Sequence, residues 1–310
     1  MRAKRFYCRR NKDAADDFIK ALRAAGYLWV STVEEADFLF MDHDWVGYDA
    51  SDNYNRALRS KPMFIYPHTP YSYFLWDGVW KAEKVLVNFV VGQAAVESMR
   101  IYGYPYRVES IGFTGCPIEE FKPTLGTKLL FAPAHPLHDG KYATPDALDQ
   151  IREVSHLIVS NLRRFERVTV RHTHTLEMCG LDEFKGRRVQ FECVDPYALA
   201  DIRNDSIRAM RQNDIVISNA TFLHMAVAIG MPALCYGCRD SIANSREGNA
   251  AHYTQYKHLM HFPLTLEDMS IDEILDCRRA RDGRIEEWKR LNIGEPFQRD
   301  NFLAVIKEYF

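Results

Sequence analysis

The sequence predicts an α/β protein built of two similar halves that face each other across a cleft. Short apolar runs alternate with stretches of helical period along the whole chain, which is typical of parallel sheets covered by helices. The 310 residues correspond to about two domains at roughly 150 residues each. A Pro/Gly-spaced stretch, Gly112–Gly126, interrupts the alternation. We therefore expect one domain over residues 1–116, a linker over 117–127 and a second domain from 128 onwards.

The first half alternates strands and helices from its first residues. Its strand-like runs are Arg5–Cys8, Tyr27–Val30, Phe38–Met41, Met63–Tyr66, Val85–Val91 and Tyr106–Ile111. Helices are expected at Asp13–Ala25, Val33–Ala36 (short and acidic), Asn53–Arg59 and Gln93–Tyr102. In the first of these helices the apolar residues Phe18, Ile19 and Leu22 share one face, which indicates packing on a sheet.

The second half repeats this alternation after the linker. Its strand-like runs are Lys128–Phe131, Val168–Arg171, Val189–Cys193, Asp214–Ser218 and Ala233–Tyr236. Helices are expected at Asp146–Arg163, Pro196–Arg211, from Ser218 to Gly230, and near Ile271–Arg278, Arg284–Leu291 and Asp300–Tyr309. Ligands of open parallel sheets bind outside the carboxyl ends of the strands, so the residues that follow each strand are the candidates for a site.

Composition and missing motifs exclude several classes of protein. Hydrophobic residues are 47% and charged residues 26% of the chain, which excludes a disordered or fibrous protein. No apolar run reaches about 18 residues, and no apolar segment follows the basic N-terminus, so neither a membrane span nor a secretory signal is expected. Seven cysteines, mostly in apolar runs, predict reduced thiols and a cytoplasmic location. The net charge of −2 gives no global signal for nucleic acid.

Common site motifs are also missing. The patterns GxxxxGK[ST], GxSxG, HExxH and an early GxGxxG are absent, which argues against several frequent enzyme classes. Cys235 and Cys238 form a CxxC pair without a second pair at zinc-finger spacing, and its start lies in an apolar strand. We interpret this pair as structural and expect no metal site.

The strongest local pattern is the end of the run Asp214–Ser218. The small residues Ser218, Asn219, Ala220 and Thr221 lie between this strand and a helix. A helix start offers free backbone N–H groups and the positive end of the helix dipole, which suit a diphosphate. Ordinary helix capping by Ser218, Asn219 or Thr221 explains the same residues.

A second candidate follows the strand-like run Val168–Arg171. Arg171 can bind a phosphate through two parallel hydrogen bonds, and His174 can donate to it or protonate a leaving group. A polar strand end in solvent is the alternative.

Two strands of the first half end in candidate bases. His68 lies between two prolines, which hold it in an extended turn and suit it to deprotonating an acceptor hydroxyl. A histidine that only caps the loop is the alternative. Asp42 and Asp44 follow another strand as Asp-x-Asp, which can act as a base or hold a divalent cation, and which also occurs by chance.

Aromatic residues are concentrated between Phe64 and Trp80. Part of this segment belongs to the core. Tyr71, Tyr73 and Trp76 fit neither a strand nor a helix period, so they are candidates for a platform that stacks an acceptor sugar or base.

An ordered series of segments resembles the GT-B glycosyltransferases, nearest to the group of CDP-glycerol glycerophosphotransferases and non-hydrolysing UDP-GlcNAc 2-epimerases. Lys128–Pro133 is similar to the strand and Ala-Pro turn that open the second domain there, and Val170–His174 to an Arg-x-His segment. Ile111–Pro117 is similar to the Gly-x-Pro turn before the linker, and Asp214–Pro232 to the strand, turn and helix that hold the donor's phosphates. His68 falls where the glycerophosphotransferases have His-Gly, with threonine in place of the glycine.

The resemblance implies two Rossmann-like domains, with the acceptor on residues 1–116 and a nucleotide-sugar donor on 128–298. The last helix, in 299–310, then packs back on the first domain. The diphosphate rests on the helix start after Ser218, and Arg171 and His174 offset the charge that develops as the nucleotide leaves. A base from the first domain, His68, Asp44 or Asp42, deprotonates the acceptor. No metal or other cofactor is required.

The helix after Ser218 departs from the resemblance. The similar families usually carry an acidic residue there that binds the donor's ribose hydroxyls. This chain has His224 and Met225 instead, and we assign these two residues to the ribose and base of the donor.

The sequence therefore predicts transfer of a sugar from a nucleotide-sugar donor, such as a UDP-sugar, to an acceptor hydroxyl. The acceptor is either a glycan or polymer, or a hydroxylated base in phage-type DNA that leaves the stack and is received by aromatic side chains. Glycerophosphate or polyol-phosphate transfer and epimerisation of a nucleotide sugar are alternatives, as is a non-catalytic nucleotide-sugar-binding module. Product formation from the donor alone would distinguish an epimerase.

Overall fold

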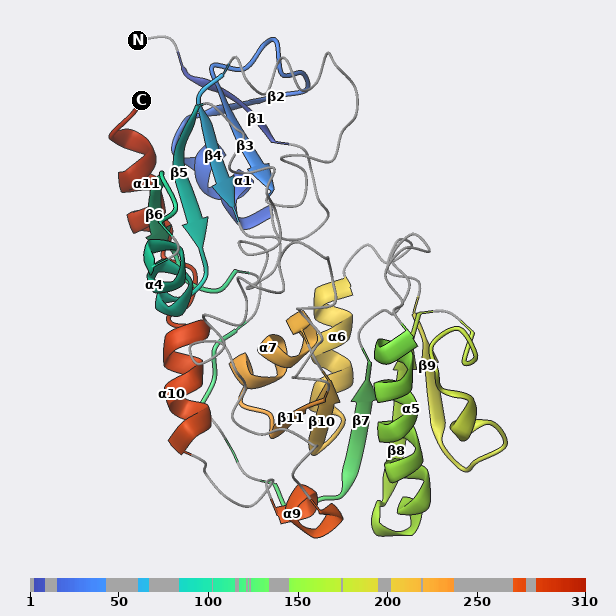
Figure 1. The fold of residues 1–310 in the computed structure, drawn as a ribbon. Helices are drawn as coiled ribbons and strands as arrows, with labels where there is room; N and C mark the ends of the chain where they lie inside the picture. The colour runs from blue at the N-terminus through green and yellow to red at the C-terminus, as the bar shows by residue number, and fades with distance from the viewer. Residues whose placement is uncertain are drawn as a thin grey trace. The chain divides into compact units, whose positions relative to one another are not determined.

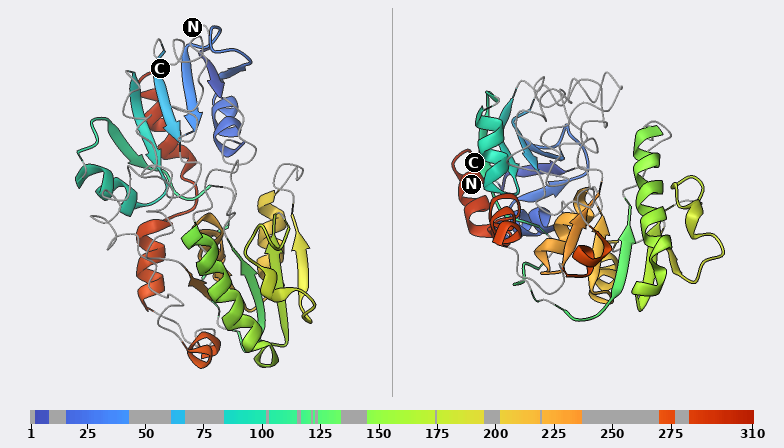
Figure 2. Two further views of the ribbon diagram at one scale, coloured as in Figure 1. Left: turned by 45° about the vertical axis from the view of Figure 1, so that its right-hand side comes forward. Right: turned by 60° about the horizontal axis from the view of Figure 1, so that its bottom comes forward.

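The computed structural model describes residues 3–8, 16–42, 61–66, 84–101, 103–114, 117–120, 122, 124–133, 145–173, 175–194, 202–218, 220–236, 270–276 and 283–310. The chain divides into two compact units. The first comprises Met1–Gly115 together with Arg290–Phe310, and the second comprises Cys116–Lys289. Each unit has its own parallel sheet with helices (Figures 1 and 2).

The described residues of the first unit form a six-stranded sheet with the order β2-β1-β3-β4-β5-β6. All of its neighbouring strands are parallel. The strands are β1 (Arg5–Cys8), β2 (Leu28–Val30), β3 (Phe38–Asp42), β4 (Met63–Tyr66), β5 (Val85–Val90) and β6 (Arg107–Ser110). Every residue of β4 is buried, because a central strand of a parallel sheet is covered on both faces.

Helices cover both faces of this sheet, as the alternation of side chains along β5 demonstrates. Val87 and Phe89 belong to the core that α1 (Asp16–Ala24) and α11 (Arg299–Lys307) also line. Asn88, between them, points to the opposite face, where its side-chain amide lies 3.7 Å from the sulfur of Met99 in α4 (Gln93–Ile101). The helix at the end of the chain is thus part of the core of the first unit.

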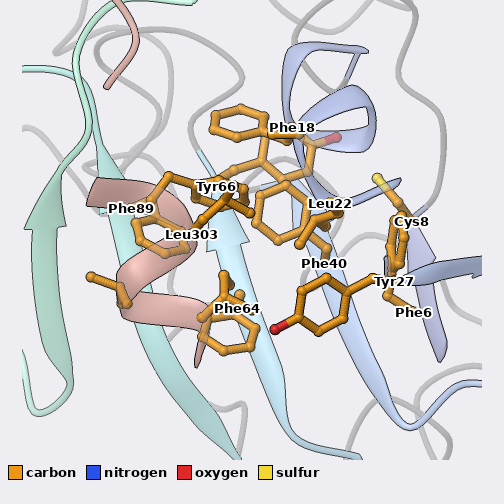
Figure 3. Packing of buried hydrophobic residues seen from close by; sticks show 14 of the residues in the cluster. Phe6, Cys8, Phe18, Leu22, Tyr27, Phe40, Phe64, Tyr66, Phe89 and Leu303 are labelled. Carbon is orange, nitrogen blue, oxygen red and sulfur yellow. The ribbon is translucent and has the colours of Figure 1, made fainter. Parts of the chain in front are cut away.

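The core of the first unit is a cluster of aromatic rings between the sheet and the helices α1 and α11 (Figure 3). The ring of Phe18 lies 5.1 Å from that of Phe40, 5.4 Å from that of Tyr66 and 5.3 Å from that of Phe302, measured between centroids. Phe302 also lies 5.2 Å from Phe89. Such pairs contribute about 0.5–1.5 kcal/mol each beyond the burial of their area. Residues near the two ends of the chain therefore stabilise one core.

The segment that leads into α11 lies directly against two glycines. The backbone N–H of Phe113 donates to the carbonyl of Glu295 at 3.0 Å, and that of Gln298 donates to the carbonyl of Ile111 at 2.9 Å. Between these bonds is Gly112, whose φ of +80° favours glycine, and whose Cβ would lie 2.5 Å from the carbonyl oxygen of Glu295. A Cβ at Gly92 would lie 2.6 Å from the carbonyl carbon of Asn292. The absence of a side chain at both positions allows this approach of two backbones.

The second unit has a five-stranded parallel sheet among its described residues, with the order β11-β10-β7-β8-β9. The strands are β7 (Lys128–Ala132), β8 (Arg167–His172), β9 (Gln190–Cys193), β10 (Ile215–Ser218) and β11 (Ala233–Cys235). Numbered from β7, this order is 5-4-1-2-3, which is the strand order of the Rossmann fold. The chain reverses direction across the sheet between β7 and β10, and this switch point is where such sheets bind ligands.

Helices and short 3-10 helices lie between these strands, and the helices α9 (Ile271–Asp276) and α10 (Gly283–Asn292) follow β11. Those between the strands are α5 (Pro145–Ser160), η3 (Leu162–Arg164), η4 (Asp182–Phe184), α6 (Ile202–Arg211) and α7 (Ala220–Ala228). In helix α7 every residue from Leu223 to Ala228 is less than 9% exposed. A helix that is apolar all round belongs in a core, and α7 packs against β10 and β11.

Side chains hold β7 and β10 together at both ends of their pairing. At one end, the Asp214 carboxylate accepts the backbone N–H of Lys128 at 2.9 Å, and the Asp214 N–H donates to the Lys128 carbonyl at 2.7 Å. Gly126 leaves room for this carboxylate, because a Cβ there would lie 2.6 Å from Asp214 Oδ1. At the other end, the Ser218 hydroxyl donates to the Ala132 carbonyl at 2.6 Å. Hydrogen bonds from side chains therefore fix the register of β10 against β7 at both ends of the pairing.

The predicted fold class, α/β with parallel sheets in two Rossmann-like units, is confirmed. The expected helix at Val33–Ala36 is wrong: these residues form a turn closed by one bond from the Ala36 N–H to the Val33 carbonyl. Four residues gain too few intrahelical bonds to offset the cost of starting a helix. The helix expected at Asn53–Arg59 lies outside the described residues.

Replacing Gly92 with alanine should destabilise the protein by about 3 kcal/mol, the upper end for overpacking, because the new methyl group would meet the backbone of Asn292. Chemical denaturation would measure the change in the unfolding midpoint. Gly283→Ala is the control, since nothing lies within 4 Å of its added Cβ. Equal midpoints for the two variants would contradict the close packing of the residues before α11 on Gly92.

Phe302→Ala should lower the free energy of unfolding by about 3–5 kcal/mol, because it removes a fully buried ring that touches Phe18, Phe40 and Phe89. Lys307→Ala, at an exposed position of the same helix, should change it by less than about 0.5 kcal/mol. If the two variants unfolded alike in denaturant, α11 would not belong to this core.

Candidate functional site

The candidate site lies at the carboxyl ends of β7 and β10, at the switch point of the second sheet. β10 ends at Ser218, which is fully buried, and its hydroxyl is engaged by the carbonyl of Ala132 at the end of β7. Ser218 therefore joins the two strands on either side of the crevice. Its predicted contact with a phosphate stays a prediction.

Helix α7 begins at Ala220, two residues after the end of β10 (Figure 1). Ala220 and Thr221 lie in the first turn of the helix, as expected, and Asn219 lies outside the described residues. The backbone N–H groups of a first turn have no partner inside the helix, and the helix dipole favours an anion there. The topology thus brings a helix start to the switch point.

Arg171, near the end of β8, is the centre of a buried ionic cluster. Its Nη1 lies 3.0 Å from Glu192 Oε2 in β9, and its Nη2 lies 2.6 Å from Asp205 Oδ2 in α6. Asp205 also pairs with Arg208 one turn later in the same helix. The side chain of Arg171 is only 8% exposed, so these carboxylates supply the counter-charge that a buried guanidinium requires.

This cluster is connected to the first turn of α7. The guanidinium carbon of Arg171 lies 6.0 Å from the ring centroid of Phe222, the third residue of α7, in a cation–π contact. Arg171 therefore stands beside the helix start that the sequence analysis assigned to a diphosphate. In the structure its guanidinium is bound to two carboxylates, and its predicted contact with phosphate stays a prediction.

His224 and Met225, the residues assigned to the donor's ribose and base, lie inside α7. The His224 ring has no exposed surface and packs on Trp288 of α10, with centroids 4.7 Å apart. Met225 is 7% exposed. The structure therefore gives His224 a packing role between two helices, and a ribose would have to reach a covered imidazole.

Most residues assigned to the acceptor side lie outside the described residues: His68, Asp44, Tyr71, Tyr73 and Trp76, as does His174. The backbone of Asp42 is described as the last residue of β3, and it pairs in register with Tyr66, the last residue of β4. The segments that carry the Asp-x-Asp and His68 thus leave the sheet from neighbouring strands.

Glu192 and Asp205 were not predicted from the sequence. A signal for them existed, because Arg171 lies in a predicted strand, where a buried cation needs an acidic partner. Glu192 lies in the next predicted strand, and the pair Asp205 and Arg208 has the spacing of a helical ion pair. The partners are 21 and 34 residues from Arg171, so local patterns do not identify them.

Among the described residues, no group of three or more His, Cys, Asp or Glu side chains is arranged to hold a metal ion. None of the helices in the described part of the chain is long and apolar enough to span a membrane.

No protein-family model matches the sequence, and no curated protein matches it. Solved structures do match. S. aureus MnaA, solved with UDP, superposes with a TM-score of 0.55 at 12% identity, over 100% of this chain and 97% of that one. Acinetobacter baumannii MurG gives 0.48 at 10% identity over 98% and 99%, and the calicheamicin glycosyltransferase CalG4 gives 0.47 at 11% over 100% of both chains. The likeness to MnaA, together with the strand order of the second sheet, confirms the GT-B fold that the sequence resemblance implied.

Arg171→Met should destabilise the protein by about 1–3 kcal/mol, because Glu192 and Asp205 lose the hydrogen bonds of their shared cation while Asp205 keeps Arg208. Arg187→Met, at an exposed position of the same unit, should stay within about 0.5 kcal/mol of the original protein. Urea denaturation would measure the free energies of unfolding of both variants and of the original protein. Similar values for both variants would mean that the cluster contributes nothing to the fold.

Proposed function

We propose that the protein is a glycosyltransferase that moves a sugar from a UDP-sugar donor to an acceptor hydroxyl. The observation that carries the proposal is the start of α7 at the switch point between β7 and β10, where a Rossmann-type sheet binds its ligand. The fold shared with MnaA, a protein solved with UDP, supports a uridine nucleotide as the donor's leaving group.

In the proposed reaction the N–H groups of the first turn of α7 bind the diphosphate, and the dipole of the helix offsets its charge. The acceptor oxygen bonds to the anomeric carbon as the bond from that carbon to the β-phosphate oxygen breaks, and UDP leaves with the electron pair. His174 and the positive end of the helix stabilise the charge on the departing UDP. No step requires a metal ion.

The acceptor side of the proposal rests on the sequence. A base, His68, Asp44 or Asp42, takes the proton of the acceptor hydroxyl. Tyr71, Tyr73 and Trp76 provide a surface on which the acceptor stacks. A glycan or polymer hydroxyl is the acceptor class we propose. Supplying a UDP-sugar with glycan acceptors, and separately with DNA that carries hydroxylated bases, would identify the acceptor by mass spectrometry of the products.

Ala220→Asp tests the diphosphate site. A carboxylate in the first turn of α7 favours the helix itself but repels a diphosphate, so UDP should bind roughly tenfold or more weakly while the protein stays folded. UDP at about 100 times its Kd should stabilise the original protein by about 2.7 kcal/mol in a thermal-shift assay.

Gln93→Asp is the matched control, because it adds the same charge to the first turn of α4, in the first unit. It should leave UDP binding unchanged. Absence of a UDP-dependent shift in the original protein would overturn the proposed donor, and equal binding by the two variants would place the diphosphate away from α7.

A further inference from the structure

The two carboxylates on Arg171 are held to different degrees. Asp205 is 16% exposed and is bound by two arginines, Arg171 and Arg208. Glu192 is 34% exposed, and the ion pair that it makes among the described residues is with Arg171, at 3.0 Å. The Glu192 side chain reaches solvent, whereas the Arg171 side chain is buried. The contact of Arg171 with Glu192 is therefore the easier one to exchange.

The guanidinium of Arg171 lies near the start of α7, where the diphosphate is proposed to bind. The guanidinium contacts Phe222 in the first turn of α7, and Nη1, the nitrogen bound to Glu192, is one of the groups through which arginine binds phosphate. Asp205 holds Nη2, and Ser206 Oγ lies 3.5 Å from the same nitrogen. One edge of the guanidinium is thus anchored in α6, and the other carries a carboxylate that a second anion can replace.

We infer that Glu192 is an affinity-determining residue that occupies Arg171 until the diphosphate of the donor takes its place. Before exchange, the charges of Arg171 and Arg208 balance those of Glu192 and Asp205. On binding, a phosphate oxygen replaces Glu192 on Nη1 and the Glu192 carboxylate turns into solvent, where water satisfies it. Asp205 keeps the guanidinium in place throughout. No covalent bond changes in this step.

The inference rests on the proposed function and deepens it, because it names a residue that sets the affinity of the donor site. The diphosphate must compete with a charged hydrogen-bond acceptor before it gains Arg171. A neutral amide of the same shape competes less well, since it still accepts a hydrogen bond from the guanidinium but loses the attraction between opposite charges. Glu192 therefore lowers the affinity for UDP, and its replacement should tighten binding. Replacement of a residue that only supported the fold of the site would weaken binding.

Glu192→Gln tests the inference by calorimetric titration with UDP. The variant should bind UDP roughly three- to tenfold more tightly than the original protein. Without ligand it should melt at a lower temperature, because it loses an ion pair of a buried arginine. These opposite signs separate displacement from a structural defect, which would lower the melting temperature and weaken binding together.

Two further variants complete the test. Glu166→Gln, which removes an exposed carboxylate 3.5 Å from Lys128 in the same unit, should bind UDP as the original protein does. In an Arg171→Gln background, Glu192→Gln should no longer tighten binding, because the effect acts through the guanidinium. If that background does not fold, a crystal structure of the UDP complex gives the same answer, since Glu192 should have left Nη1.

The outcomes are distinguishable. UDP binding that is unchanged or weaker in Glu192→Gln overturns the inference and leaves the proposed function standing. Retention of the contact between Glu192 and Arg171 in the UDP complex also overturns it. If UDP binds to neither protein, the proposed donor fails and the inference fails with it.

Discussion

The pairing of β7 with β10 is the constraint on which the second unit depends. These strands are separated by about 85 residues of chain, yet they are neighbours in the sheet, and every other strand extends outward from one of them. Asp214 fixes one end of the pairing and Ser218 the other, each through a hydrogen bond to the backbone of the partner strand. A slip by one residue would break both bonds and move every side chain of β10, all of them buried, to the opposite face of the sheet.

The position of α7 follows from this pairing. Because β10 ends where Ser218 meets Ala132, the helix that follows starts at the crevice and not along the side of the sheet. Burial of its apolar side chains against β10 and β11 then fixes its direction. The position of the candidate site thus follows from the register of β10 against β7 and from the burial of the apolar helix α7.

Much of the fold could be predicted because the information is local. β4 occupies the predicted run Met63–Tyr66, and β10 ends at the predicted Ser218, since buried strands of parallel sheets are short apolar runs with sharp polar ends. The packing of the residues before α11 on Gly92 and Gly112 was not predicted, because it joins segments about 180–200 residues apart. The same reason applies to the site: Arg171 was visible in the sequence, whereas the acids that neutralise it come from β9 and α6.

Because Arg290–Phe310 belong to the first unit and line its core, that unit is completed only after the second unit has been synthesised. The ribosome releases Phe18, Phe40 and Phe89 early, and at typical elongation rates roughly 10–40 s pass between residue 115 and the emergence of Phe302. During that interval the whole second unit is synthesised, while the first unit still lacks one wall of its aromatic cluster. The nascent protein therefore exposes an incomplete hydrophobic surface on its N-terminal part, which is the kind of surface that chaperones bind.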